Sequence, residues 1–202
     1  AAFRLASALN ACEGADLPSN FFWAPVSVLR HADGREERFP HLVTDRAKPG
    51  VIAVNQKAER FVNESNSYHH FASAMQSQPE NAPCFLICDA LAMKRYGLGL
   101  ARPAPVNNDA LIEAGYLHKA DSLARLAQQL GLDAQALAGT VARYNRDAAQ
   151  GEDPQFAKGG NSYNRAMGDP GHQPNACNAP LLKAPFYAIT LYTGDLGTSR
   201  GL

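Results

Sequence analysis

The 202-residue chain lacks an excess of charge of either sign, because 19 Lys and Arg balance 19 Asp and Glu. A nucleic-acid-binding domain usually carries a strong basic excess, so we expect no nucleic-acid partner. Long apolar runs are missing too. None approaches the roughly 18 residues that a membrane-spanning helix needs, which predicts no membrane span. The first residues do not show the charged and apolar pattern of a signal peptide.

Cysteine is scarce and scattered. Of the four cysteines, Cys84 and Cys88 alone are close in sequence. Residues four apart on a strand lie about 13 Å from each other, too far to share a metal ion, so we predict two buried thiols. The six histidines show no metal-binding spacing, and we predict no metal site. Cysteines without a disulfide framework favour a reducing compartment, so we expect a cytoplasmic protein.

Signatures of nucleotide binding and of hydrolases are absent as well. The chain contains no G-x-G-x-x-G after a strand, no phosphate-binding P-loop and no G-x-S-x-G nucleophile turn. A complete dinucleotide-binding fold is therefore not encoded. The chain starts at Ala1 without a methionine, in a segment typical of a helix (residues 1–11), and stops at Gly201-Leu202. We interpret it as a piece excised from a longer protein.

The residues that are present predict a mixture of helices and strands. Aspartate or serine precedes most of the helix-forming segments and glycine follows them, which indicates helix caps. The predicted helices cover residues 67–76, 90–96, 123–130 and 134–149, with a short turn near residue 112. The predicted strands form two hairpins, 26–29 with 37–39 and 51–55 with 60–62, and two further strands at 83–89 and 186–192. A long ordered loop is expected between residues 151 and 185.

Four stretches together match the pattern of one enzyme family. Residues 50–65 read GVIAVNQKAERFVNES and resemble the I-x-V-N-x-x-G-x-R-F-V-N-E signature of FAD-dependent fumarate reductase and ketosteroid dehydrogenase flavoproteins, with Ala58 in place of the glycine. Residues 84–96 resemble the strand and helix that follow this signature. Residues 123–144 resemble the family's L-A-x-x-L-G-L-D and T-V-x-R-Y-N helix pair, and residues 184–198 its P-F-Y-A and G-D-L-G-T return segment.

The resemblance implies a fold and a place in a larger protein. In this family a capping domain that holds the substrate is inserted into a two-part FAD domain. We therefore expect an α+β fold with a small mixed or antiparallel sheet. Residues 1–45 would enter from the flavin domain, 46–185 would form the substrate domain, and 186–202 would be the return strand and loop. The expected partner is the flavin domain of the same full-length protein, and FAD is expected to bind mainly to parts outside this chain.

Two departures from the family pattern narrow the expected substrate. In fumarate reductases an arginine shortly after the V-N-E motif belongs to the proton-delivery path, whereas Tyr68 closes the matching stretch here. A substrate-binding histidine of the return segment is replaced by Gly197. Both changes remove groups that suit a dicarboxylate, so a small apolar carbonyl substrate of the ketosteroid type is favoured. Arg200 also stands where the family usually has glycine.

The implied reaction is an α,β-dehydrogenation, or its reverse, at a carbon–carbon bond next to a carbonyl. A hydride passes between substrate and flavin, and a tyrosine handles the proton on the neighbouring carbon. Tyr68 is the first candidate for this catalytic role and Tyr96 the second, although each can instead pack as an ordinary aromatic. The alternative function is a stand-alone binding or interaction domain without catalytic activity.

Side chains near these tyrosines are candidates for substrate binding. We expect His69 and His70 to assist Tyr68 or to bind substrate. Trp23 is expected to wall an apolar pocket together with its aromatic neighbours Phe21 and Phe22, unless all three belong to the core.

The return segment holds the candidates for cofactor contact. Its closely spaced glycines let the backbone approach a flat ring, although a simple turn would look similar. The candidates are Gly194, Asp195, Leu196, Gly197 and Thr198. In the signature segment, Glu64 either orients the loop before Tyr68, together with Asn63, or pairs with Arg60 on the surface.

Overall fold

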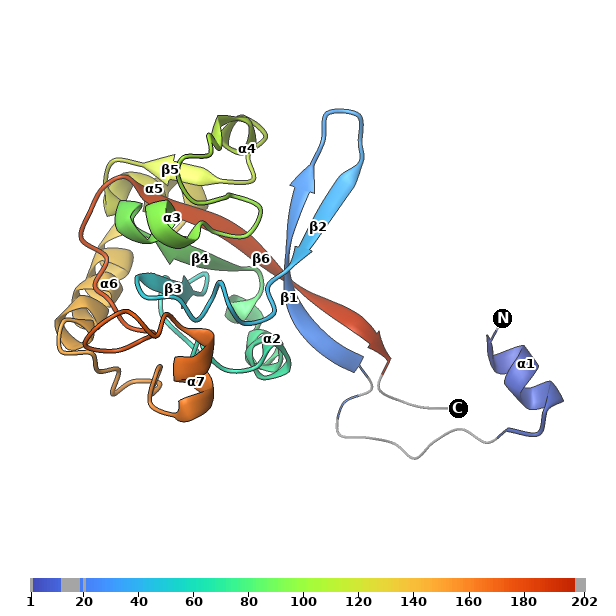
Figure 1. The fold of residues 1–202 in the computed structure, drawn as a ribbon. Helices are drawn as coiled ribbons and strands as arrows, with labels where there is room; N and C mark the ends of the chain where they lie inside the picture. The colour runs from blue at the N-terminus through green and yellow to red at the C-terminus, as the bar shows by residue number, and fades with distance from the viewer. Residues whose placement is uncertain (1, 12–18, 20, 199–202) are drawn as a thin grey trace.

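A six-stranded antiparallel sheet organises the residues described by this computed structural model, which are 2–11, 19 and 21–198 (Figure 1). The strands follow the order β2-β1-β6-β4-β3, and β5 also pairs with β6. Their bounds are β1 Phe21–Arg30, β2 Glu36–Pro40, β3 Val51–Val54, β4 Cys84–Cys88, β5 His118–Ala120 and β6 Phe186–Thr198. The expected α+β class with a small antiparallel sheet is confirmed.

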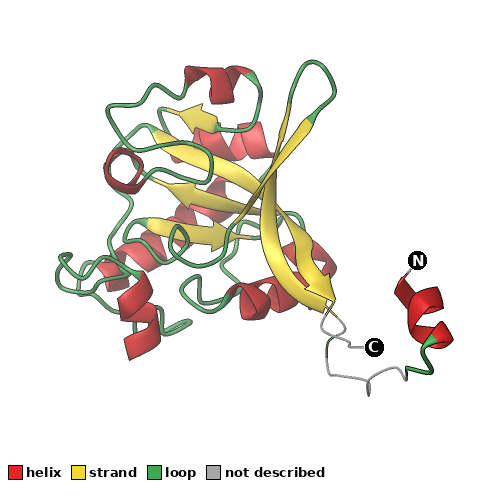
Figure 2. Cartoon of the chain, turned by 45° about the vertical axis from the view of Figure 1, so that its right-hand side comes forward, coloured by secondary structure: helices red, strands yellow, loops and turns green. Residues whose placement is uncertain are grey.

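Helices cover both faces of the sheet (Figures 1 and 2). Their bounds are α1 Ala2–Ala8, α2 Tyr68–Gln76, α3 Ala90–Tyr96, α4 Asp109–Glu113, α5 Leu123–Leu130, α6 Ala134–Ala148 and α7 Ser162–Met167, with a 3₁₀ turn η1 at Pro79–Asn81. Alternate residues of β3 and β4 face α2 and α3 on one side and α5 and α6 on the other, which gives two apolar cores. Among the described residues, no helix combines the length and the apolar character needed to cross a bilayer.

The helix starts that the sequence predicts are confirmed. Each of Ser67, Asp89, Ser122 and Asp133 accepts a hydrogen bond from a backbone N–H of the first turn that follows it. These bonds satisfy donors that a helix start otherwise leaves unpaired. Cys84 and Cys88 lie fully buried on β4, as expected, and burial raises the pKa of both thiols. Cys12 lies outside the described residues.

The predicted hairpin around residues 32–34 is confirmed and is longer than expected. β1 pairs with β2 from Val26 opposite Pro40 to Arg30 opposite Glu36. The two strands form a ribbon that projects from the helix-covered part of the sheet (Figure 1). The central strand β6 joins the two halves, because it pairs first with β4 and β5 and then with β1.

Two sequence predictions about strands are wrong. Residues 60–62 do not return beside β3, which pairs instead with β4. The turn after β3 is present, since Asn55 Oδ1 accepts hydrogen bonds from the backbone N–H groups of Lys57 and Glu59. The chain then leaves the sheet and carries the Arg60 guanidinium into the protein. The segment from Gly194 to Thr198 is not a loop or turn but the second half of β6, held by pairing with β1.

Ala58 explains why its family signature has glycine at this position. Its φ is +60°, in the left-handed region that glycine adopts without steric cost. For an L-residue with a Cβ, this backbone conformation costs about 1–2 kcal/mol in conformational free energy. Ala58 is fully buried, so the turn retains this conformation under tight packing.

A buried chain of polar side chains fastens the ribbon to the body of the protein. Ser27 Oγ on β1 lies 2.7 Å from His41 Nε2 and 2.7 Å from the Tyr116 hydroxyl. His41 Nδ1 bonds in turn to the Asp45 carboxylate. The backbone N–H of Leu100 donates to the Tyr116 oxygen over 3.0 Å. Burial raises the pKa of Tyr116, and its hydrogen bonds with Ser27 and with the backbone N–H of Leu100 oppose this only in part.

Candidate functional site

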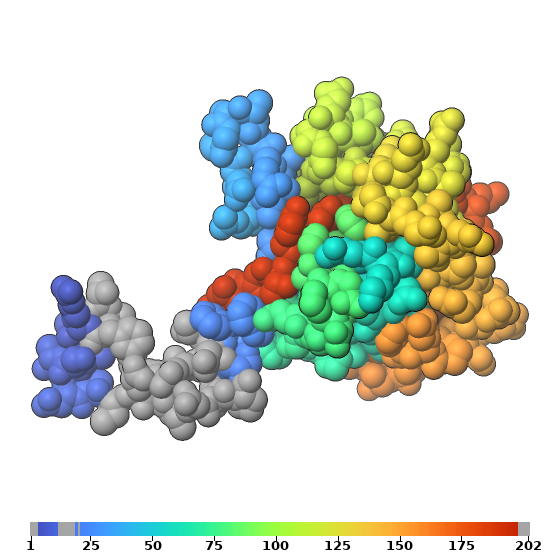
Figure 3. All heavy atoms as spheres, turned by 180° about the vertical axis from the view of Figure 1, so that it is seen from behind, coloured from blue at the N-terminus to red at the C-terminus, as the bar shows by residue number. Residues whose placement is uncertain are grey.

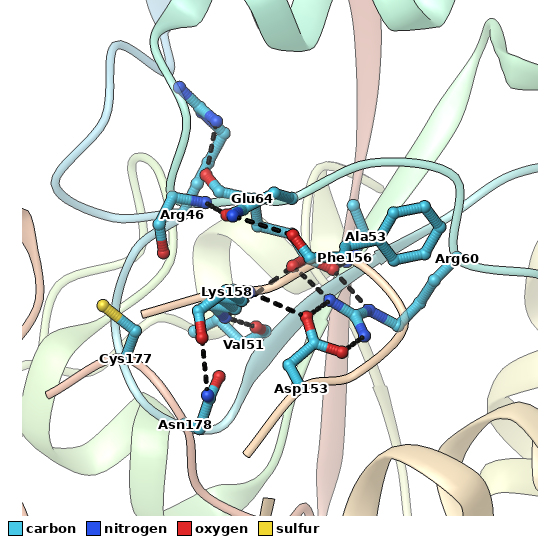
Figure 4. Close-up of polar contacts among 12 residues, drawn as sticks. Arg46, Val51, Ala53, Arg60, Glu64, Asp153, Phe156, Lys158, Cys177 and Asn178 are labelled. Carbon is cyan, nitrogen blue, oxygen red and sulfur yellow. Dashed lines mark hydrogen bonds and ion pairs between the residues drawn. The ribbon is translucent and has the colours of Figure 1, made fainter. Parts of the chain in front are cut away.

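The loop between β3 and α2 leads to Tyr68, the first residue of α2. Arg46 contacts this loop at Glu64 (Figure 4). The buried Arg46 guanidinium donates to the backbone oxygens of Glu64 over 2.6 Å and of Asn66 over 3.1 Å. It also donates to the carbonyls of His41 and Leu42, and its charge lies 4.6 Å above the Phe71 ring. One side chain therefore connects the segment after β2 to Glu64 and Asn66, shortly before the helix cap Ser67. Burial lowers the pKa of Arg46 to about 10.

Four more charged side chains meet beneath the same loop. Arg60 Nε and Nη2 donate to Glu64 over 2.8 and 2.7 Å, and Arg60 Nη1 and Nη2 donate to Asp153 over 2.7 and 2.9 Å. Lys158 is fully buried, with Nζ 4.0 Å from Glu64 and hydrogen-bonded to the carbonyl of Val51. The predicted pairing of Glu64 with Arg60 is confirmed, but the pair is buried instead of lying on the surface.

Electrostatics keep the two carboxylates of this buried cluster ionised. Burial alone would raise the pKa of Glu64, but the charges of Arg60 and Lys158 outweigh it and hold that pKa below its usual value. The pKa of Asp153 is lowered against burial mainly by its bonds to Arg60. Burial lowers the pKa of Lys158, and the nearby carboxylate of Glu64 only partly compensates. An arginine that forms paired hydrogen bonds with two carboxylates is held in a rigid geometry. It therefore restrains the backbone from Arg60 to Glu64.

Amide side chains complete the support of the loop. Asn63 Oδ1 accepts from the backbone N–H of Ser65 over 2.8 Å. Asn63 Nδ2 donates to Asn164 Oδ1 over 3.0 Å and to the Phe156 carbonyl over 3.1 Å. Asn164 also donates to the Ser65 carbonyl over 3.0 Å. The loop before Tyr68 is therefore held by α7 and by the buried charges, as the first interpretation of Asn63 and Glu64 requires.

Tyr68 is the first residue of α2, and it is half-buried. Successive helix residues point about 100° apart, so His69 and His70 face other directions than Tyr68. His69 is half-buried and His70 is exposed. The phenol thus lies at the end of a firmly supported loop, at the start of a helix whose next turn packs into the core through Phe71 and Ala72.

A hollow of about 480 Å³ separates α2 from the start of β1. The two elements lie side by side when the molecule is viewed from behind (Figure 3). The lining residues are Ser19, Phe21, Trp23, His69, Ser73, Gln76 and Ser77. The structure therefore brings together two predicted substrate-binding residues, Trp23 and His69, and leaves His70 outside the lining. The Phe21 and Trp23 rings are 5.0 Å apart, whereas Phe22 is exposed.

Tyr96, the second catalytic candidate, lies elsewhere. It ends α3 and lines a separate hollow of about 540 Å³ with residues such as Pro49, Leu91 and His172. Its hydroxyl donates to Asp169 Oδ2 over 2.6 Å, and Arg95 pairs with the same oxygen at 2.7 Å. Burial and the bond to the carboxylate both raise the pKa of Tyr96, so its proton stays in place. This geometry supports the packing interpretation of Tyr96.

Replacing Tyr96 by Phe should therefore affect stability more than turnover. We expect a loss of about 1–2 kcal/mol in the free energy of unfolding, because one hydrogen bond to a charged acceptor disappears while Arg95 still neutralises Asp169. Urea denaturation and steady-state kinetics of the full-length protein measure the two effects. Turnover that falls by about 100-fold or more while stability stays unchanged would restore the catalytic interpretation.

The second half of β6 packs against β1 on one side and leaves its other side without a described strand partner. A Cβ at Gly194 would lie 2.6 Å from Val26 Cγ2, so this glycine serves the packing of β1 on β6. Gly197 has φ +144° and open space where a Cβ would be, which leaves its backbone accessible. β4 pairs with β6 only as far as Leu191, so the following residues present N–H and C=O groups along an edge that no described strand covers. These groups are available to hydrogen-bond a polar ligand.

Sequence reasoning missed several residues of the site. Ser73 and Gln76 follow His69 at intervals of four and seven, so helical spacing alone was a sufficient signal for them. Arg46 and Lys158 gave no signal, because an isolated basic residue in a sequence is normally exposed. Arg200 lies outside the described residues.

Comparisons with known proteins place this geometry in a family. Residues 2–202 match the family described as FAD binding domain. The chain is 43% identical over 185 residues to 4-oxocyclohex-2-ene-1-carboxylate 5-dehydrogenase of Sinomonas cyclohexanicum, which covers 89% of this chain and 31% of that protein. It is 34% identical over 210 residues to 3-oxosteroid 1-dehydrogenase of Mycolicibacterium smegmatis, which covers 100% of this chain and 35% of that protein.

A solved structure shows the same fold. The crystal structure of 3-ketosteroid delta1-dehydrogenase from Sterolibacterium denitrificans, in complex with 1,4-androstadiene-3,17-dione, matches with a TM-score of 0.84 and 33% identity over all of this chain and 36% of that one. The chain thus spans about a third of the length of the relatives that it matches. The resemblance drawn from the four sequence stretches is confirmed, and the chain belongs to the FAD binding domain family.

Proposed function

We propose that this chain is the substrate side of an FAD-dependent oxidoreductase that introduces or reduces a carbon–carbon double bond next to a ring carbonyl. The observation that carries the proposal is the placement of Tyr68. A buried ionic and amide framework holds the loop before it, and an aromatic hollow lies on the next face of its helix. The chain belongs to a family of flavoproteins, and relatives at 43% and 34% identity are named for acting on cyclic ketones.

Tyr68 supplies the proton chemistry in this proposal. When bound, the flavin exchanges a hydride with one carbon of the substrate. The Tyr68 oxygen acts as a phenolate when it takes up the proton from the adjacent carbon during dehydrogenation, and the resulting phenol gives that proton back during reduction. The carbon next to a carbonyl is the one that loses a proton readily, so the reaction requires a base on the substrate side of the flavin.

The remaining site residues orient the substrate. The Phe21 and Trp23 rings offer an apolar wall to an alicyclic skeleton. The hollow's described lining holds no Lys or Arg, which disfavours a dicarboxylate relative to a neutral ring ketone. Backbone groups of residues 194–198 would contact the flavin when it is bound, and the protein would then hold substrate and cofactor within reach of each other.

The partner of this chain is the flavin domain of the same full-length protein, which binds most of the FAD. Residues 46–185 form the substrate domain, and residues 1–45 and 186–202 connect it to the flavin domain. β1 and β6 belong to the connecting parts and yet lie in the central sheet. The boundaries therefore describe positions in the longer protein and not separate folding units.

The direct test uses the full-length protein. We expect it to purify with bound FAD and to lose flavin absorbance under anaerobic conditions when mixed with a saturated cyclic ketone or a 3-ketosteroid. Fumarate serves as the control and should not reoxidise the reduced protein. A preparation that binds FAD but responds to fumarate alone would contradict the proposed substrate class, and one that binds no FAD would support a binding domain instead.

A further inference from the structure

We infer that the hollow between α2 and β1 is a subsite for a hydrogen-bonding oxygen carried by the substrate at a distance from its reacting carbons, with His69 as the residue that recognises it. This inference rests on the proposed function, because it concerns the same substrate. It adds a determinant of specificity that the reaction itself does not need. Tyr68 exchanges a proton with the reacting carbon, and its neighbour His69 binds an oxygen elsewhere on the substrate.

The hollow has one apolar and one polar wall. Phe21 and Trp23 form the first, where an alicyclic ring can lie on aromatic faces. The second is a single face of α2, formed by His69, Ser73 and Gln76. Ligand sites typically combine an apolar lining with a few convergent polar groups, within volumes of about 300–1,000 Å³. At about 480 Å³ the hollow is large enough for such a ligand group.

His69 carries an independent sign that a ligand atom is missing. Its Nδ1 atom is buried and has no hydrogen-bond partner among the described residues. Buried polar atoms in folded proteins are nearly always paired, because an unpaired one loses its bond to water without replacement. A rotation of the imidazole that turns Nδ1 toward the hollow would let a substrate oxygen seated there provide the missing partner.

The orientation of α2 separates His69 from its neighbours. Tyr68 lies on the helix side that continues into the core through Ala72 and Met75. His69, about 100° further around the helix, lies above Ser73 and Gln76 and lines the hollow. His70 is exposed and is not part of the lining. The two adjacent histidines therefore make a matched pair for a test.

The experiment uses full-length wild-type protein and the variants His69→Ala, His69→Asn and His70→Ala. Two pairs of probes differ by one oxygen-bearing group: cyclohexanone against 4-oxocyclohexanecarboxylate, and a 3-ketosteroid without against one with an oxygen on its far ring. The first pair tests an anionic oxygen and the second a neutral one. KM and kcat are measured for each, and thermal shift on adding each probe gives binding without turnover.

We expect His69→Ala to raise KM about tenfold for the oxygen-bearing member of at least one pair, with kcat and the plain member little changed, since one hydrogen bond is lost. The pair affected shows whether the oxygen is charged or neutral. His69→Asn should restore part of the effect because its amide reaches toward the position of Nδ1. His70→Ala should behave as wild type.

Equal losses on both members of each pair, or a larger loss with His70→Ala, would overturn the inference. Turnover and binding separate its failure from that of the proposed function. If no probe is turned over but the thermal shift depends on His69, the proposed reaction is wrong and the subsite is supported. Absence of any His69-dependent shift in a protein that does turn over ring ketones would sink the subsite alone.

Discussion

Replacing Tyr68 by Phe in the full-length flavoprotein is expected to slow turnover of its ring ketone by about 100-fold or more. The phenylalanine keeps the ring in the same place at the start of α2, so the loop, the helix cap and the hollow remain intact. What disappears is the oxygen that exchanges a proton with the carbon next to the carbonyl. The rate of flavin reduction, followed by absorbance in a stopped-flow instrument, measures the effect directly.

A matched tyrosine in the same protein provides the control for this variant. Tyr163 lies on α7 with 43% of its surface exposed, so Tyr163→Phe removes a phenol oxygen at a position away from the hollow. It should leave flavin reduction unchanged. Flavin content should equal that of wild type in both variants. Near-normal turnover by Tyr68→Phe would move the acid/base role to Tyr96 or to a residue outside this chain.

Replacing Glu64 by Ala should lower the free energy of unfolding by about 3–5 kcal/mol, because it leaves a buried arginine and a buried lysine without their shared carboxylate. Glu64 accepts from Arg60 over 2.8 and 2.7 Å and from the backbone N–H of Ala53 over 3.0 Å, and all of its oxygens are removed from water. Urea denaturation of wild type and variant measures the difference. Glu36→Ala is the control, since Glu36 forms a comparable bond of 2.9 Å with Arg38 at the exposed edge of β2 and its loss should change stability little.

The effect of Glu64 should depend on pH in a defined direction. Its pKa in the folded protein is lowered by Arg60 and Lys158 despite burial, so the folded state favours the ionised carboxylate. The stabilisation is complete above the pKa of an unfolded glutamate, about 4.3, and disappears as the pH falls through the lower folded value. The stability gap between wild type and Glu64→Ala should therefore be constant near neutrality and narrow in strong acid. A gap that widens in acid would contradict this assignment.

The sequence was sufficient for those parts of the fold that depend on local chemistry. Side chains such as Ser67 and Asp133 favour helix starts by bonding to the nearest free N–H groups, and this preference operates within three residues. The hairpin at residues 32–34 and the buried strand of Cys84 and Cys88 are equally local. Membership of the flavoprotein family followed from motifs that combine such local requirements.

The predictions that were wrong concern contacts between distant residues. A strand at 60–62 was expected because a turn follows β3, yet Arg60 instead reaches Asp153, which is 93 residues away in sequence. Similarly, a glycine-rich segment at 194–198 is typical of a loop, but Gly194 is needed so that β6 can lie close to Val26 on β1. In both cases the structure of the segment depends on the distant residue or strand that it contacts, and the local sequence does not identify that partner. The hollow at His69 has the same origin, since its two walls come from β1 and α2.

The hydrogen bonds that connect the ribbon to the body all run in one direction from donor to acceptor. If Asp45 accepts the Nδ1 hydrogen of His41, then His41 Nε2 accepts from Ser27, Ser27 accepts from the Tyr116 hydroxyl, and Tyr116 accepts from the N–H of Leu100. Every hydrogen then has one destination and every donor is used once. Removing any member leaves a hydrogen or a lone pair on the next one without its partner, and Ser27, His41 and Tyr116 are buried. The ribbon and the body are therefore connected through side chains whose hydrogen bonds depend on one another.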